Sequence, residues 1–339
     1  MTSLPASAPA GAARTAGPAS QFASFIQRQG VLIALGGLIL FGALRYDNFL
    51  SAYNLWSVLR FNSMFALIGL GMTFVIMTGG IDLSVGAVAA FASVIAALLS
   101  PYGLLPAVAG ALAGGTLLGL VNGVVISRMK VLPFVATLAM LLGARGLALV
   151  FAGNRSVSVD PSSGLIAEFG QGDVGGVPIP VIIAAFAFVI GSLVLNRTQY
   201  GRHVLAIGGN EEAARLMGLR VERILTIVYT VNGLLAATAG VLLAAQFGAG
   251  QPTEGLGWEL SAIASVVVGG TLLTGGLGSV GATLVGVLLL GLIFNILNFE
   301  NGRGVISLSA YWQSVIRGAF LLAVVVLQNR LARRRSSGI

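Results

Sequence analysis

Few side chains of this sequence belong to the types that catalyse reactions or bind metal ions. The 339 residues include no cysteine, His203 is the one histidine and Lys130 the one lysine. Disulfides, thiolate nucleophiles and cysteine-ligated metals are therefore excluded, and one histidine cannot supply a histidine pair for zinc or haem. Lys130 lacks the preceding glycine loop that cradles phosphates, which excludes a Walker-type ATPase. We expect no catalytic residue, metal or cofactor in this chain, and an energy source in a gradient or a partner.

The composition requires elements that lie in a membrane. Apolar residues make up 56% of the chain and charged residues 9%, against about 25% charged in soluble domains. Residues 83–127 contain no charge, which is long enough for two helices that each cross a hydrocarbon core of about 30 Å. We therefore predict an all-α integral membrane protein with about ten transmembrane helices, some interrupted by glycines. The expected spans are 31–44, 61–81, 83–100, 104–127, 131–152, 174–196, 224–246, 259–275, 279–299 and 305–329.

The net charge of +8 follows the expected membrane topology. Thirteen Lys and Arg fall in segments that this plan places inside, whereas four, including Arg60, fall in outer loops. Such asymmetry is typical of the positive-inside rule and does not indicate nucleic-acid binding. Both termini are expected in the cytoplasm, with a disordered tail over 1–28 and a basic tail over 330–339.

Glycine is the second strong feature, with 48 residues. The spacing Gly115-x-x-x-Gly119-x-x-x-Gly123 predicts a helix face that a neighbouring backbone approaches closely. Two further segments, 79–86 and 269–276, resemble each other, and paired glycine-interrupted segments are typical of transport pathways. A duplicated packing element with no ligand role fits equally well. The candidate path residues are Gly79, Gly80, Asp82, Ser84, Gly86, Gly269, Gly270 and Thr271.

The hydrophilic loop 197–223 contains a short helix with its own start and stop signals. Asn210 is a good N-cap, Glu211 and Glu212 are acids at the positive helix end, and Gly218 is a C-terminal stop. A helix of about two turns is unstable alone, so it must dock on a partner or on its own bundle. Its remaining residues are Ala213, Ala214, Arg215, Leu216 and Met217.

The segment 212–218 resembles the Glu-Ala-Ala-x-x-x-Gly coupling loop of ATP-binding-cassette importer permeases, without the Leu-Pro that often follows it. Segments 78–86, 200–201, 206–210 and 259–271 resemble, in order, the ribose/galactose/xylose-type sugar permeases. The likeness covers about residues 55 to 330. The sequence of the second half, with Asn298-Phe299-Glu300 and Tyr311-Trp312, most resembles one permease of bacterial galactofuranose importers.

The resemblance implies a permease domain over 29–329 in the bacterial inner membrane, with 197–223 as its cytoplasmic coupling loop. It implies three kinds of partner: cytoplasmic ATPase subunits, a second permease and a periplasmic sugar-binding protein. A sibling second permease is favoured and a copy of this chain is the alternative. The outer loop 153–173, with Asp160, is a candidate contact for the binding protein.

Several polar residues fit two roles each. Asp82 is the one acid well inside the apolar sequence, where a charge costs about 2.5–3.5 kcal/mol; it fits a helix cap near the inner interface or a contact to sugar hydroxyls. Arg145 fits an interfacial anchor or a partner of Asp82. Trp258 fits an interfacial anchor or a sugar-stacking ring. Asn122 and Asn232 fit interhelical packing or the sugar path.

Three other classes of protein compete with this interpretation. A gradient-driven secondary transporter is the main alternative, although such carriers usually keep several intramembrane acids or histidines. An intramembrane enzyme would need a histidine base or paired carboxylates, which the spans do not offer. A channel would leave the capped cytoplasmic helix unexplained.

Overall fold

The computed structural model describes residues 18–302 together with 312, 315–316, 318–319 and 322, and side chains from residue 30 onward. The long helices are α1 (Pro18–Arg45), α2 (Ala52–Met77), α3 (Val85–Leu99), α4 (Leu104–Ser127), α5 (Pro133–Ala152), α6 (Ile179–Arg197), α9 (Val221–Phe247) and α11 (Val280–Gly302). The short helices are α7 (Gln199–Gly209), α8 (Glu211–Leu216) and α10 (Trp258–Val268).

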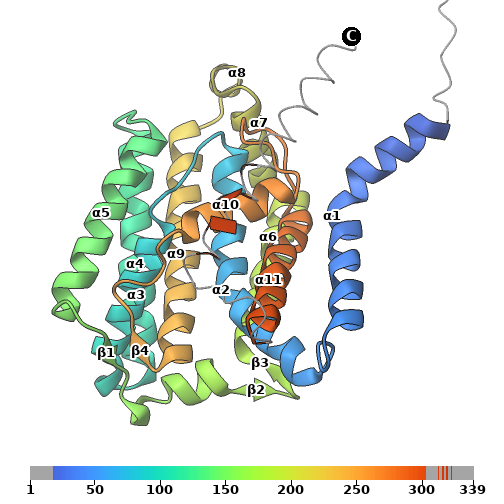
Figure 1. Cartoon of the computed structure of the whole chain (residues 1–339). Coiled ribbons are helices and arrows are strands. Elements are labelled where there is room, and N and C mark those ends of the chain that lie inside the picture. Colours follow the sequence, from blue (N-terminus) through green and yellow to red (C-terminus); the bar gives the residue numbers. More distant parts are fainter. Residues whose placement is uncertain (1–17, 303–311, 313–314, 317, 320–321, 323–339) are drawn as a thin grey trace, which may run out of the picture.

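Two-residue strands and short turns make up the rest of the regular structure in the described residues. Strand β1 (Val157–Ser158) pairs antiparallel with β4 (Ala249–Gly250), and β2 (Asp173–Val174) with β3 (Val177–Pro178). They lie at one end of the helix bundle, whereas α7 and α8 lie at the other (Figure 1). We name these the β end and the α8 end. A π-helical turn over Ile166–Gln171 and 3-10 turns over Ser100–Tyr102 and Pro161–Ser163 complete the connections.

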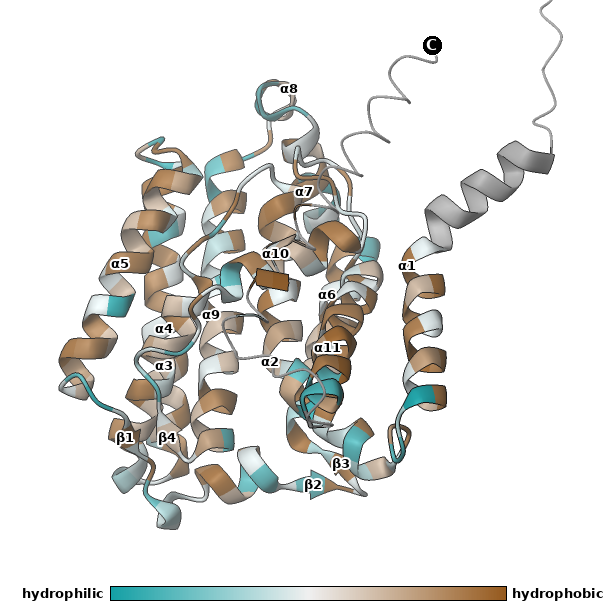
Figure 2. Cartoon of the chain, viewed as in Figure 1, coloured by the Kyte–Doolittle hydropathy of each residue, from teal (hydrophilic) through white to brown (hydrophobic). Residues whose placement is uncertain are grey.

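The all-α membrane fold predicted from the sequence is confirmed. Seven helices in the described residues are long and apolar enough to cross a membrane, and Gly30–Arg45 and Trp258–Val268 are shorter apolar helices. Apolar residues cover the length of these helices, as Figure 2 shows. The expected span 305–329 lies largely outside the described residues, as do the basic tail 330–339 and residues 1–17 of the tail expected to be disordered over 1–28. Residues 18–28 of that tail are helical and form the beginning of α1.

Three expected spans differ clearly from the structure. Helix α1 begins at Pro18, before the expected start at residue 31. Helix α2 begins at Ala52 and not at 61, because Ser51 caps it: the Ser51 hydroxyl accepts a hydrogen bond from the Asn54 amide at 3.3 Å. Asn54 also exchanges side-chain hydrogen bonds with Asn295 of α11, which explains a polar first turn. Arg60 therefore lies within α2 and not in an outer loop.

The expected span 259–275 is only the 11-residue helix α10, about 16 Å long at 1.5 Å per residue. Residues 251–257 before it are not helical, and Gly255 and Gly257 have φ of +77°, a region that favours glycine. A segment of α10's length spans about half of a 30 Å hydrocarbon core.

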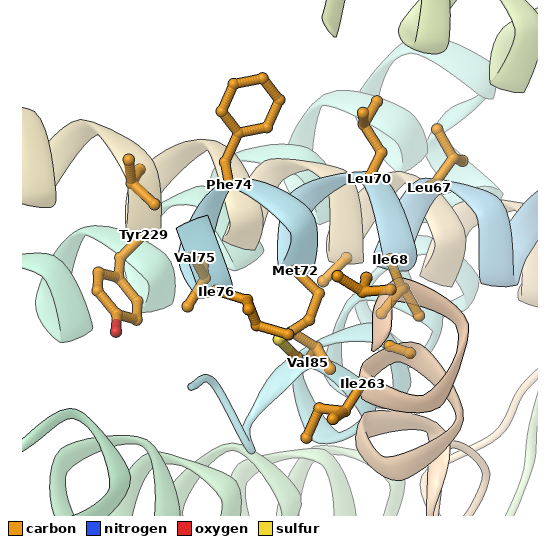
Figure 3. Packing of buried hydrophobic residues seen from close by; sticks show 14 of the residues in the cluster. Leu67, Ile68, Leu70, Met72, Phe74, Val75, Ile76, Val85, Tyr229 and Ile263 are labelled. Carbon is orange, nitrogen blue, oxygen red and sulfur yellow. The ribbon is translucent and has the colours of Figure 1, made fainter. Parts of the chain in front are cut away.

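The core is centred on α2, α3 and α9. Every residue of α2 from Ala66 to Met77 is buried, and its apolar side chains pack with Val85 of α3, Tyr229 of α9 and Ile263 of α10 in one cluster (Figure 3). Lipid is as apolar as these side chains, so close van der Waals packing, and not removal from water, holds such a cluster together in a membrane.

The predicted glycine face of α4 packs directly on α9. A methyl group on Gly119 would lie 2.5 Å from the Tyr229 carbonyl oxygen and 2.9 Å from the Gly233 Cα. Gly123 has its close neighbour in Thr226, and Gly115 in the Gly233 carbonyl. The spacing thus allows two backbones to approach within van der Waals contact, as predicted.

Candidate functional site

Helix α8 begins and ends as the sequence predicts. The Asn210 side chain accepts a hydrogen bond from the Ala213 amide at 2.9 Å, which satisfies one of the free donors at the helix start. The helix is followed by Met217 and then by Gly218, whose φ of +85° is the left-handed conformation typical of a helix stop. Six residues therefore form a separate helix directly after α7.

An ion network attaches α8 to the bundle. The Arg215 guanidinium contacts Glu211 at 2.8 Å and also Glu222, near the start of α9, and Lys130 contacts Glu222 at 3.1 Å. Hydrogen bonds to these two carboxylates raise the pKa of Arg215, so its charge is constant. Exposed pairs of this kind contribute about 0–1 kcal/mol each, so the network orients α8 more than it stabilises the fold.

The outward face of α8 is apolar at its end. Ala214 is fully buried against the bundle, whereas Leu216 and Met217 are 84% and 72% exposed. Leu216, the last residue of α8, and Met217 after it thus form an exposed apolar pair beside charged residues.

The two glycine segments lie against each other at the α8 end. We name residues 78–84 the first glycine loop and residues 269–279 the second. The Gly276 amide donates to the Met77 carbonyl at 3.0 Å, and a methyl group on Gly275 would lie 2.8 Å from the Gly79 nitrogen. Gly79, Gly275 and Gly276 all have positive φ, so the loops meet backbone to backbone.

The other candidate path residues are distributed around this contact. Gly80 is buried beneath the Tyr229 hydroxyl, and Gly269 packs on Ala282 of α11. Gly270 is exposed and Thr271 is buried, and the Thr271 hydroxyl has no hydrogen-bond partner in the described part of the chain. Gly86 is not part of the group, because it lies in α3 against Gly255.

Asp82 is the centre of a buried polar cluster. Its Oδ1 accepts hydrogen bonds from the Ser84 amide at 2.8 Å and the Ser84 hydroxyl at 2.6 Å, and its Oδ2 accepts one from the Asn232 Nδ2 at 2.8 Å. Asn122 of α4 donates to the Ser84 hydroxyl at 3.0 Å. The Thr137 hydroxyl of α5 accepts from the Leu83 amide at 3.1 Å, so α4, α5 and α9 all hold the first glycine loop.

This placement bears on the roles expected for Asp82 and Arg145. Asp82 is 2% exposed and contacts the twelfth residue of α9, about 16 Å along that helix, so it lies in the protein interior and not at the interface. Its carboxylate binds Ser84, directly before α3. Arg145 is not its partner. The Arg145 Nη1 donates instead to the Pro252 carbonyl at 2.6 Å and to the Glu254 carbonyl.

Arg145 therefore has a structural reason to lie within α5. The non-helical segment 251–257 leaves carbonyl groups without helical partners, and such groups must be satisfied by protein at membrane depth. The arginine side chain supplies two of these hydrogen bonds, so it has a role inside the protein whether or not it also anchors α5 at an interface. Trp258 is covered by protein: it is 6% exposed and packs on Phe65 of α2, with ring centroids 4.8 Å apart, so it is not an interfacial anchor.

The outer loop 153–173 is folded at the β end. The Asp160 carboxylate accepts hydrogen bonds from the Ser162 amide at 2.8 Å and its hydroxyl at 2.7 Å, and these lower the pKa of Asp160. The Asp160 amide is held by the Ser100 hydroxyl at 2.8 Å. A negative charge is thus kept at a fixed place on this end of the molecule.

Two residues of the site, Thr137 and Tyr229, were missed from the sequence. They give no signal of their own, because threonine and tyrosine are common in membrane helices. The close packing of Gly208 at the end of α7 was also not predicted, although its segment 206–210 was singled out. The doubled glycine at 208–209 before the Asn210 cap is the one pattern that indicates a close backbone contact there.

Comparisons with known proteins agree with this architecture. Residues 54–325 match the family model described as "Branched-chain amino acid transport system / permease component". The chain is 39% identical to the ribose import permease protein RbsC of Escherichia coli K12 over 311 residues, which cover 91% of this chain and 95% of the relative. It is also 39% identical over 312 residues to RbsC of Bacillus subtilis 168, with the same coverage. It is 34% identical over 319 residues to the L-arabinose ABC transporter permease protein AraH of Azospirillum brasilense, which cover 93% of this chain and 91% of the relative.

The family model matches most of the described helices, and the relatives are more than 30% identical along nearly the whole chain. This chain and those relatives therefore share a common ancestor. The multi-pass helical fold is that of a membrane transport component. The chain belongs to the family of transport-system permease components that this model describes.

Proposed function

We propose that this protein is the permease subunit of an ATP-binding-cassette importer that carries a monosaccharide of the pentose class across the bacterial inner membrane. The observation that carries this proposal is the likeness to ribose and arabinose permeases over more than 90% of the chain. The family description refers to branched-chain amino acids, but the relatives cited above import pentoses. Galactofuranose, expected from the wording of the second half, does not occur in the names of those relatives and stays a prediction.

Helix α8 supplies the contact to the ATPase in this proposal. Its exposed Leu216 and Met217 enter a groove on the ATPase, and the ion network of Arg215 keeps the helix in one orientation. ATP-driven closure of two ATPase subunits then displaces α8 and the helices attached to it. The permease itself needs no cofactor and catalyses no reaction, since hydrolysis takes place on the partner.

The sugar path is completed by a second permease, and a sibling chain is favoured over a copy. The two glycine loops lie at the α8 end, where a gate towards the cytoplasm would close the path, and their backbone contact supports this role. A periplasmic sugar-binding protein delivers the substrate at the β end, where Asp160 is held in a folded loop.

A gradient-driven transporter is the remaining alternative. Such a carrier binds its coupling ion with an intramembrane acid. Asp82 is the acid available in the core, and its carboxylate already accepts three hydrogen bonds from the protein, which favours a structural role.

The first test is a tagged purification from native membranes in mild detergent, with identification of co-purifying chains by mass spectrometry. We expect a cassette ATPase and a second permease. Leu216→Asp with Met217→Asp should remove the ATPase, whereas Val174→Asp, the same change at an exposed apolar residue of the β end, should not. A chain that purifies alone under several gentle conditions would favour the gradient-driven alternative.

The substrate class has its own test. Cells that express the whole importer should accumulate labelled ribose or arabinose, and labelled leucine should not compete. Uptake of leucine in place of a sugar would show that the family description gives the substrate class correctly and the proposal does not.

A further inference from the structure

One close contact joins α7 to the second glycine loop and to the last residue of α2, directly before the first glycine loop. A methyl group on Gly208, in the last turn of α7, would overlap the Met77 carbonyl oxygen and lie 2.5 Å from the Gly276 nitrogen. The Gly276 amide itself donates to that Met77 carbonyl at 3.0 Å. Three backbone segments that are far apart in the sequence thus touch at Gly208 with no side chain between them.

Helices α7 and α8 form one rigid unit next to this contact. Only Asn210 separates them, and its amide donates to the Ala206 carbonyl of α7 while its side chain caps α8. Val204 and Ile207 hold α7 on the bundle, and both are buried. A displacement of α8 therefore moves Gly208, because no flexible linker lies between them.

The first glycine loop continues from this contact to the buried polar cluster. Met77 ends α2, and five residues later Asp82 binds Ser84 at the start of α3 and Asn232 of α9. The second loop leads from Gly276 into α11, which begins at Val280. A shift at Gly208 is thus passed to the ends of α2 and α10 and to the beginnings of α3 and α11.

We infer that Gly208 is the positioning residue through which α8 acts on the two glycine loops. This inference rests on the proposed function, since it assigns a route for the displacement that an ATPase would impose on α8. Packed backbone transmits small movements because it has no side chain that can change rotamer and absorb them. A residue larger than glycine at 208 separates α7 from the loops and breaks the route.

Adjacent glycines provide a matched test. Gly208→Ala places a methyl group on two backbone segments, whereas a methyl group on Gly209 meets nothing within 4 Å. In proteoliposomes that hold the complete importer, Gly208→Ala should lower sugar uptake at least tenfold while ATP hydrolysis persists, and Gly209→Ala should match the unaltered protein in both. Normal uptake by Gly208→Ala, or uptake and hydrolysis that fall by the same factor, would overturn the inference.

A second measurement does not depend on how well Gly208→Ala folds. The chain has no cysteine, so spin labels can be placed on single introduced cysteines without other changes. Residue 209 can be paired with 277, across the contact, and with 134, at the start of α5; Leu277 and Phe134 are 61% and 55% exposed. Between the nucleotide-free and ATP-trapped importer, the 209–277 distance should stay constant while the 209–134 distance changes.

The two levels of proposal fail in different ways. If no ATPase purifies with the unaltered chain, the proposed function is wrong and the inference falls with it. If the unaltered importer transports sugar but the 209–277 distance changes as much as the 209–134 distance, the importer stands and the route through Gly208 is refuted.

Discussion

The Asp82 cluster permits a pair of substitutions with opposite expected outcomes. In Asp82→Ala, the Ser84 amide, the Ser84 hydroxyl and the Asn232 Nδ2 lose their acceptor in a site that is 2% exposed. In Asp82→Asn, the new carboxamide oxygen still accepts from Ser84. Its amide group can donate to Asn232, because the Asn232 Oδ1 is without a partner among the described residues and the side-chain amide can rotate to present it.

The magnitudes follow from these contacts. A buried donor left unpaired costs about 1–3 kcal/mol, so three such donors in Asp82→Ala cost about 3–9 kcal/mol. Asp82→Asn exchanges a charged acceptor for a neutral one and costs about 1.5 kcal/mol or less, since a neutral hydrogen bond contributes about 0.5–1.5 kcal/mol. The free energy of unfolding of a domain is commonly about 5–15 kcal/mol. The alanine variant therefore loses a large share of this free energy, and the asparagine variant does not.

The assay combines thermal melting of the purified complex with uptake in proteoliposomes. We expect Asp82→Ala to melt earlier and to lower uptake, and Asp82→Asn to keep most of both. Wild-type melting and uptake of a normally expressed Asp82→Ala would refute the hydrogen-bond reasoning. An Asp82→Asn protein that melts normally but does not transport would show that the charge, and not the hydrogen bonds, is what the site needs.

Three further changes test other parts of the structure. Arg145→Met leaves two loop carbonyls unpaired and should destabilise the protein by about 2–5 kcal/mol, measured as a lower melting temperature. An unchanged melting temperature would favour the interfacial anchor as the main role of this arginine. Gly119→Ala should cost about 1–3 kcal/mol through overpacking and should reduce the amount of protein in the membrane. Gly143→Ala is the control and should not reduce it, because a methyl group on Gly143 meets nothing within 4 Å. Equal amounts of both variants would contradict the close approach of α4 and α9. Asn210→Ala removes the cap of α8 at about 1 kcal/mol and should lower the amount of ATPase that co-purifies, which full recovery would disprove.

The sequence predicts what depends on local rules. Absence of charge over 83–127 indicates membrane helices, Asn210 and Gly218 mark the ends of α8, and the four-residue glycine spacing in α4 indicates close packing. Each of these signals acts within one helix or one turn, so it needs no knowledge of neighbours.

Features that depend on distant partners could not be predicted in this way. Arg145 and the carbonyls of 252 and 254 are about a hundred residues apart, and only the folded chain shows that the arginine satisfies a non-helical segment. Trp258 looks like an interfacial aromatic because it stands beside Glu259 at the start of an expected span, but Phe65 covers it. Gly208 appears as one glycine among 48 until Met77 and Gly276 are placed beside it.

The short length of α10 has a consequence for how the protein is made. Eleven apolar residues are about half of what the bilayer needs to hold a helix, so lipid alone cannot retain α10 after it leaves the ribosome. Its neighbours α2 and α3 are synthesised before it, but α11, on which Gly269 and Ser265 pack, is synthesised after it. The segment 251–268 therefore has only part of its final packing until α11 is complete, and Arg145 lacks its two carbonyl partners for about a hundred residues of synthesis.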